Sequence, residues 1–144
     1  MKKMIMNIIR DKIHDHKILD SEIIQDLKYE RNNNLEFNIN WIDRSPNWLG
    51  FSLLMHAVRS DREELVGYLL SIPGININYT TRTANTTALH LTKSVPVLKL
   101  LLSRRDININ IENIRGYTAL DVAINRKRHD IVDVMCIFFG DTQK

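Results

Sequence analysis

Apolar residues recur along this chain in pairs of short bursts, and a polar, asparagine-rich tail follows each pair. The clearest unit has its first burst at Leu54, Ala57 and Val58 and its second at Leu65, Val66, Leu69 and Leu70. Spacings of three and four residues place apolar side chains on one face of a helix. The polar stretch between the bursts is typical of a turn. Each pair therefore predicts a helix, a turn and a second helix.

The tails repeat almost letter for letter. "SIPGININ" at 71–78 returns as "SRRDININ" at 103–110, and a weaker echo, "NLEFNIN", lies at 34–40. The segments that precede them align, and units begin at Gly50, Asn85 and Gly116, so their starts are 35 and then 31 residues apart. An interval close to about 33 residues is typical of a stacked repeat architecture. Because asparagine tolerates turn geometry, we expect each tail to lead from one unit into the next.

Two stretches carry a specific resemblance. "GYTALDVA" at 116–123 and "TALHL" at 87–91 resemble the T-P-L-H-x-A signature of ankyrin repeats. "HDIVDVM" is similar to the second helix of that family, and the "ININ" tails stand where the family has its hairpin. The resemblance implies an all-α ankyrin repeat solenoid of helix-turn-helix units joined by short β-hairpin loops. It also implies that His90, which keeps the signature histidine, holds down the loop between repeats.

The register divides a single ankyrin repeat domain, 1–144, into about four units. We expect a degenerate N-terminal capping repeat at 1–42, a repeat at 43–78, a shortened repeat at 79–110 and a C-terminal repeat at 111–144. In the shortened repeat, Pro96 suits the first turn of the outer helix, where a missing N–H is harmless. The side chains that this register predicts to be buried are Leu54, Ala57, Leu69, Leu89, Leu101, Leu120, Ala123 and Val132.

Composition indicates a globular chain, with 44% hydrophobic and 26% charged residues. No apolar run approaches the roughly 18 to 20 residues of a membrane helix, and the start lacks a signal-peptide core. Isoleucine and asparagine supply 33 of the 144 residues, which suggests an AT-rich genome such as that of a virus, protist or intracellular bacterium. We expect a cytoplasmic protein, in the host cytoplasm or nucleus if a pathogen encodes it.

Few residues are candidates for metal binding, catalysis or nucleic-acid binding. His14 and His16 do not share a helical face, so we expect a solvated helix end and no metal site. Cys136 lies among apolar neighbours, and we expect it to be packed as a small hydrophobe. No phosphate loop or nucleophile motif is present, so we expect neither an enzyme nor a cofactor. The "RKRH" run at 126–129 is a weak nucleic-acid signal, and a solvated turn is the simpler interpretation.

The leading functional hypothesis is a protein-protein interaction module that binds a protein partner through its concave face and hairpin tips. The alternatives are an IκB-like inhibitor or decoy of a transcription factor, encoded by a pathogen to target its host, and, more weakly, a nucleic-acid-associated protein. The resemblance implies contacts at hairpin tips and on the exposed side of the inner helices. The tip positions are Trp48, Leu49, Phe51, Arg82, Thr86, Arg115 and Tyr117, and the inner-helix positions are Arg59, Ser60, Asn125 and Arg126.

Two segments leave alternatives open. The loop "WIDRSPNWLG" at 41–50 carries Trp41 and Trp48, and each is either a binding finger or a hydrophobic lid over the N-terminal capping repeat, with the finger favoured for Trp48. At the other end, "MCIFF" at 135–139 places more apolar side chains on the last helix than can pack inward. It predicts a weak homo-oligomer through the C-terminal helix, unless the aromatic residues fold back over the last repeat.

Overall fold

The computed structural model describes residues 2–48 and 50–142, and within them the regular structure is helical. In chain order the elements are α1 (Lys2–His14), α2 (Asp20–Asn33), α3 (Leu53–Arg59), α4 (Glu63–Ser71), the 3-10 helix η1 (Leu89–Leu91), α5 (Val95–Leu102), α6 (Ala119–Asn125) and α7 (His129–Thr142). The described loops hold one isolated β-bridge, Ile42 to Ser52, and no strand. The all-α prediction is confirmed, although the hairpin loops are not β-ladders.

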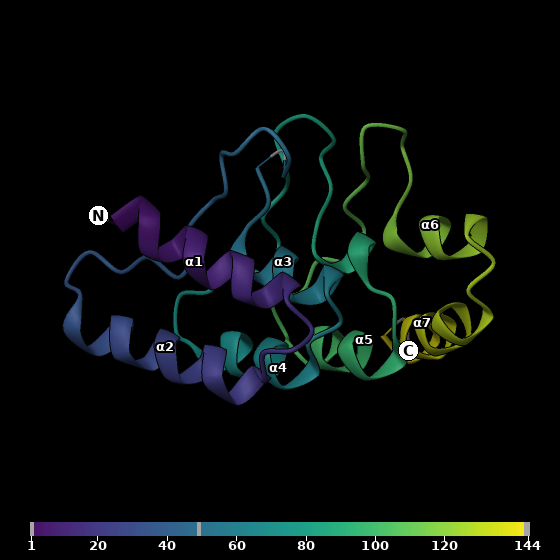
Figure 1. The fold of residues 1–144 in the computed structure, drawn as a ribbon. Helices are drawn as coiled ribbons and strands as arrows, with labels where there is room; N and C mark the ends of the chain where they lie inside the picture. The colour runs from purple at the N-terminus through teal and green to yellow at the C-terminus, as the bar shows by residue number, and fades with distance from the viewer. Residues whose placement is uncertain (1, 49, 143–144) are drawn as a thin grey trace.

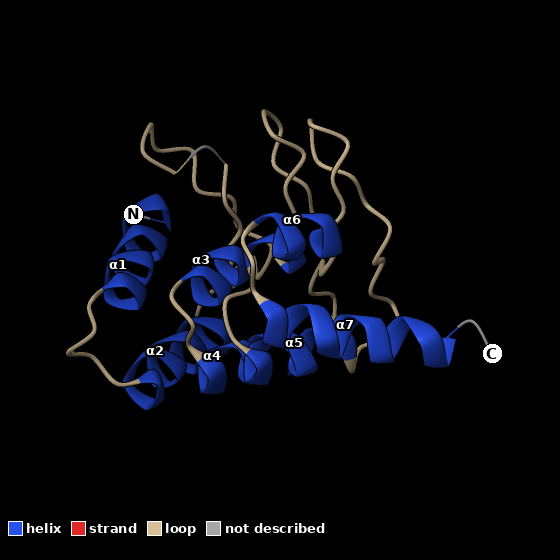
Figure 2. Cartoon of the chain, turned by 90° about the vertical axis from the view of Figure 1, so that its right-hand side faces the viewer, coloured by secondary structure: helices blue, strands red, loops and turns tan. Residues whose placement is uncertain are grey.

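The helices form two layers. Figure 1 shows α1, α3 and α6 in one row and α2, α4, α5 and α7 in the other, and Figure 2 shows the same two rows from the side. Along the inner layer α1 contacts α3, α3 contacts η1, and η1 contacts α6. Along the outer layer α2 contacts α4, α4 contacts α5, and α5 contacts α7. The long loops project from the inner layer on one side (Figures 1 and 2). We call them hairpin loops 1, 2 and 3, at residues 41–52, 79–87 and 111–118.

Short polar side chains start the inner helices. The Ser52 hydroxyl caps α3 by accepting from the Met55 amide, and Thr118 forms a capping box with Asp121 at the start of α6. In the shortened repeat, Thr87 occupies the position that Ser52 has in the repeat before it. The outer helix α4 begins eleven residues after Ser52, whereas α5 begins only eight residues after Thr87. The predicted inner helix is therefore reduced to the single turn η1. Pro96 lies in the first turn of α5, as predicted.

The repeated asparagines explain the echo in the sequence. In each tail the first asparagine of "NIN" accepts, through its Oδ1, a hydrogen bond from the backbone amide two residues later, a local turn that asparagine favours. These bonds run from the amides of Asn40, Asn78 and Asn110 to Asn38, Asn76 and Asn108, at 2.9, 3.2 and 3.0 Å.

The second asparagine of each "NIN" reaches across to the following repeat. Asn40 donates to the Gly74 carbonyl at 2.8 Å and accepts from the Asn76 amide at 2.7 Å. Asn78 does the same with Asp106 and Asn108, at 2.6 and 2.8 Å. A ladder of side-chain amides thus joins successive tails. In the described residues the Asn110 side chain has no such partner, because α7 continues to Thr142 where an equivalent tail would turn back.

A buried arginine ties the first helix pair to the second. Arg62 is 8% exposed, and its guanidinium donates to the carbonyls of Ile13 and Asp15 at 2.7 and 2.6 Å and pairs with Asp20 at 2.8 Å. Arg128, in the same place in the last helix pair, donates to the Lys93 carbonyl at 3.0 Å. Each of these inter-helix turns therefore carries an arginine that satisfies orphan carbonyls of the preceding turn.

The core agrees with most of the predicted positions. Six of the eight side chains predicted to be buried are buried, namely Leu54, Ala57, Leu69, Leu89, Leu101 and Ala123. Leu120 and Val132 are only half-buried, so those two predictions were wrong. Both belong to the last helix pair, which the described elements η1 and α5 contact from one side of the stack (Figure 1). No other described element contacts this pair from the opposite side, and these two side chains are partly open to water.

The last helix also corrects the prediction for Cys136, which is exposed and not packed. On α7, Met135 is buried, Ile137 is 67% exposed, and Phe138 and Phe139 are half-buried with their rings in contact. The proposed contact of this helix with another chain stays a prediction.

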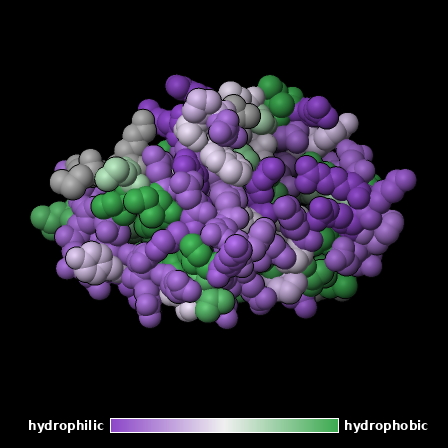
Figure 3. All heavy atoms as spheres, in the orientation of Figure 1, coloured by the Kyte–Doolittle hydropathy of each residue, from purple (hydrophilic) through white to green (hydrophobic). Residues whose placement is uncertain are grey.

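In Figure 3, hydrophilic residues cover most of one face of the molecule, and hydrophobic residues form separate small groups. None of the described helices has the length and apolar character to cross a membrane.

Candidate functional site

The predicted contact residues lie on the hairpin loops and on the inner helices or their ends, with one exception. Leu49 falls outside the described residues. Arg59, Arg82, Arg115, Tyr117, Asn125 and Arg126 are exposed, whereas Trp48, Phe51, Ser60 and Thr86 are half-buried. The structure thus divides the predicted set in two. The four half-buried residues are partly covered by other parts of the protein.

Trp48 lies against the first two inner helices. Its ring stacks on His14 of α1 at 4.3 Å between centroids and 12° between planes, and it meets His56 of α3 edge-on at 4.9 Å. Phe51 also lies close to His56, at 5.6 Å. The finger interpretation favoured for Trp48 was therefore wrong, because hairpin loop 1 folds over and the ring covers two histidines.

His14 is not the solvated helix end predicted for it, since it takes part in a hydrogen-bond network. Its Nε2 shares a hydrogen bond with His56 Nδ1 at 2.9 Å, and its Nδ1 shares another with the Ser60 hydroxyl at 2.9 Å. His56 is fully buried, and its Nε2 lies 3.2 Å from Asp43 Oδ2, outside hydrogen-bonding geometry. Asp43 accepts from Arg10 at 2.9 Å. The chain of contacts joins α1, hairpin loop 1 and α3.

Burial within the network favours the neutral form of both histidines. Burial, helped by the neighbouring His14, lowers the pKa of His56 to about 4. Burial and the positive charge of Arg59 lower the pKa of His14 as well. Burial alone would raise the pKa of Asp43, but hydrogen bonds from Ser45 and Arg10 hold it below its ordinary value. Sequence patterns could not have found this network, because residues that contact each other in it lie up to 46 positions apart in the sequence.

Hairpin loop 3 is fastened from the neighbouring repeat. His90 Nδ1 and the Thr87 hydroxyl lie 2.8 Å apart, and His90 Nε2 bonds to the carbonyl of Tyr117 at 2.9 Å. The predicted role of His90 is therefore confirmed. Tyr117 itself is 40% exposed, and its backbone is held by this bond. Arg115 is held through its own backbone amide, which donates to Asn113 at 2.9 Å.

A groove lies between hairpin loops 1 and 2. It has a volume of about 650 Å³ and is lined by Ile42, Arg44, Gly50, Tyr79, Thr80, Arg82 and Thr83. Of these only Arg82 was among the predicted contact residues. Arg44 could have been found, since it follows Asn40 by four residues just as Arg82 follows Asn78.

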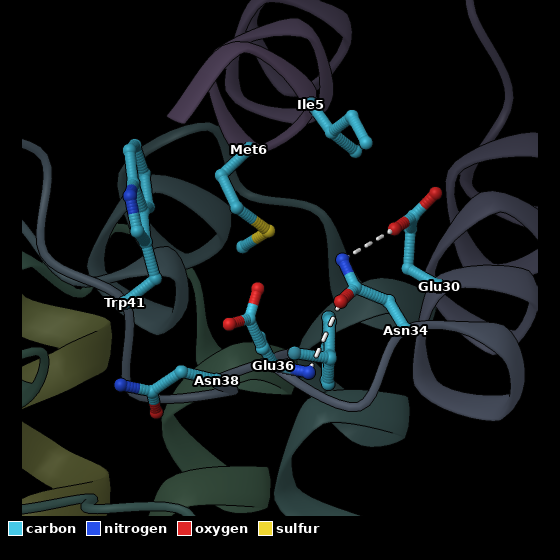
Figure 4. A pocket seen from close by; sticks show the side chains of 8 residues that line it. Ile5, Met6, Glu30, Asn34, Glu36, Asn38 and Trp41 are labelled. Carbon is cyan, nitrogen blue, oxygen red and sulfur yellow. Dashed lines mark hydrogen bonds between the residues drawn. The ribbon is translucent and has the colours of Figure 1, made fainter. Parts of the chain in front are cut away.

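A second pocket, of about 270 Å³, lies at the N-terminal end between α1, α2 and the tail that follows α2. Figure 4 shows the Trp41 ring on one side of it, with Met6 and Ile5 of α1 beside it and Glu30 and Asn34 across from them. Asn34 donates to Glu30 at 3.2 Å. Trp41 is half-buried among apolar neighbours, which favours the lid over the finger for this residue. In the described part of the chain, no three histidine, cysteine or carboxylate side chains lie together in a metal-binding group.

Comparison with known proteins decides the family. A family model described as "Ankyrin repeats (3 copies)" matches residues 54–142, which is more than half of the chain. The chain belongs to the ankyrin repeat family. A search of curated proteins found no significant match. Ankyrin repeats generally serve as protein-protein interaction modules and are typically non-enzymatic. The match begins inside α3, so the pair α1 and α2 lies outside it.

Proposed function

We propose that this ankyrin repeat protein binds a protein partner through the exposed side chains of its hairpin loops and inner helices. The surface, here called the hairpin face, consists of Arg59, Arg82, Arg115, Tyr117, Asn125 and Arg126. The observation that carries the proposal is that these exposed side chains stand on a fixed backbone. Tyrosine and arginine are enriched at binding hot spots.

Rigidity supports the same proposal. The His90 bond to the Tyr117 carbonyl and the Asn85 bond to the Glu112 carbonyl, at 2.7 Å, hold hairpin loop 3 against its neighbours. In the described residues the side chains of Arg82, Arg115 and Arg126 make no hydrogen bond or ion pair, so nothing internal has to be broken before they contact a partner. A surface that is already ordered loses little conformational entropy on binding.

The test compares two triple variants in affinity capture from lysate with identification by mass spectrometry. The first changes the hairpin face, Arg82→Ala, Arg115→Ala and Tyr117→Ala. The second is a matched control that removes one tyrosine and two cations from exposed positions of the outer helices and tails, Tyr29→Ala, Lys99→Ala and Arg105→Ala. We expect proteins retained by the unaltered chain to be lost by the first variant and kept by the control. The reverse pattern would exclude the hairpin face.

The alternatives predict different outcomes in the same assay. An IκB-like, host-targeting inhibitor would retain a transcription factor of the host. A nucleic-acid-associated protein would retain material that nuclease releases and that added salt removes steeply. A protein-binding module instead predicts that the captured protein stays bound after nuclease treatment.

A further inference from the structure

We infer that the groove between hairpin loops 1 and 2 binds an acidic peptide segment of the partner, with its carboxylates on Arg44 and Arg82 and an apolar side chain on Ile42 and Tyr79. The inference rests on the proposed function, since it assigns a partner chemistry to one part of the same edge of the molecule.

The groove is built before any ligand arrives. The Tyr79 hydroxyl donates to the Gly50 carbonyl at 2.8 Å, which joins hairpin loop 2 to hairpin loop 1 across the floor. The isolated bridge between Ile42 and Ser52 closes loop 1 at its base. Gly50 has a φ of +82°, a conformation that suits glycine and lets the loop turn at this point. The two walls therefore keep their separation without a partner.

The groove is positively charged. Arg44 and Arg82 are exposed on its two walls, and within the described residues neither guanidinium makes a hydrogen bond or an ion pair. Both act on the same phenol, because each opposes the rise that burial causes in the pKa of Tyr79. The carboxylate next to Arg44 in the sequence, Asp43, is 1% exposed and already bound to Arg10. It does not neutralise the groove.

The apolar floor of the groove favours an acidic peptide over a polynucleotide. Ile42 and Tyr79 are half-buried and apolar, and Thr80 and Thr83 add neutral hydroxyl groups. A guanidinium binds a carboxylate through two parallel hydrogen bonds, which gives direction as well as attraction. A polynucleotide requires a continuous basic surface that follows its phosphates, whereas here two cations flank an apolar floor. The combination fits a peptide in which aspartate or glutamate flanks an apolar residue.

The test uses a library of short random peptides displayed on phage, selected on the full chain. We expect selected peptides to be rich in aspartate and glutamate beside an aliphatic or aromatic residue. The double variant Arg44→Glu, Arg82→Glu should lose these peptides and select lysine-rich and arginine-rich ones instead. Selected peptides without acidic enrichment, or the same acidic peptides on the charge-reversed variant, would overturn the inference.

A selected peptide then serves as the probe in fluorescence polarisation. Arg44→Ala and Arg82→Ala should each weaken its binding by about tenfold, and Arg105→Ala, an exposed arginine on a tail, should leave it unchanged. Arg44→Lys should lose part of the affinity, because charge is kept and the paired hydrogen bonds are lost. A single-stranded oligonucleotide that binds more tightly than the peptide and displaces it would refute the peptide assignment.

Capture from lysate separates this inference from the proposed function. If the Arg82, Arg115 and Tyr117 triple variant loses the captured protein while Arg44→Ala and Arg82→Ala, each alone, keep it, the hairpin face stands and the groove assignment fails. If none of these variants changes capture, both fail. Circular dichroism and thermal melting of each variant verify that it is folded, which is expected because both arginines are exposed.

Discussion

Replacing Asn78 with alanine removes one rung of the amide ladder and leaves the rest of its turn in place. The substitution deletes the bonds to the Asp106 carbonyl and from the Asn108 amide, at 2.6 and 2.8 Å. It keeps the local bond from the Asn78 backbone amide to Asn76. Asn110→Ala is the matched control, because Asn110 has the same local bond to Asn108 but no ladder partner in the described residues.

The size of the effect follows from the two bonds. A neutral intramolecular hydrogen bond contributes a net of about 0.5 to 1.5 kcal/mol to folding. The groups left behind at Asp106 and Asn108 belong to exposed residues, so water can replace the lost partner and the cost should lie in the lower part of the range. We expect Asn78→Ala to lower the free energy of unfolding by about 1 to 2 kcal/mol and Asn110→Ala by no more than about 0.5 kcal/mol.

Urea unfolding followed by circular dichroism at 222 nm measures both variants. The corresponding loss in Tm is about 3 °C for each kcal/mol in a chain of this size. Asn40→Ala should behave like Asn78→Ala, since it makes the equivalent pair of bonds to Gly74 and Asn76. Equal losses for Asn78→Ala and Asn110→Ala would show that the asparagines act only within their own turns, and the ladder argument would be refuted.

Three further predictions concern the core and the ends of the stack. The pKa of His56 falls from 6.5 to about 4 on folding, so the unfolded chain takes up its proton first. Stability should be complete above about pH 6.5 and fall by about 3 kcal/mol as the pH drops to about 4, and His56→Gln should flatten this slope in urea titrations. Ala123→Leu should overpack the contact of α6 with η1 and cost about 1 to 3 kcal/mol in the same assay, and an unchanged midpoint would contradict the register. Cys136 should react with a thiol reagent in the folded chain as fast as in urea, and slow labelling would show that it is covered.

The sequence by itself determined the repeat architecture. Apolar spacing, the interval between tails and the "NIN" tripeptides are local properties, and each acts within a helix pair or between neighbouring pairs. Stacked repeats contact only their neighbours, so a periodic pattern is enough to predict which helices pack together. His90 could be assigned for the same reason, because the backbone that it holds belongs to the next hairpin loop.

Only the tertiary structure decided which side chains are covered and which polar groups pair. Trp48 was expected to extend into solvent, but it stacks on His14, and the histidines meet Asp43 and Arg10 across α1, hairpin loop 1 and α3. The exposure of Cys136, Leu120 and Val132 depends on the absence of a described neighbour beyond the last helix pair. The physical reason is the same in each case. Burial and pairing depend on groups that the fold brings together in space, and the local sequence around a single residue does not identify those groups.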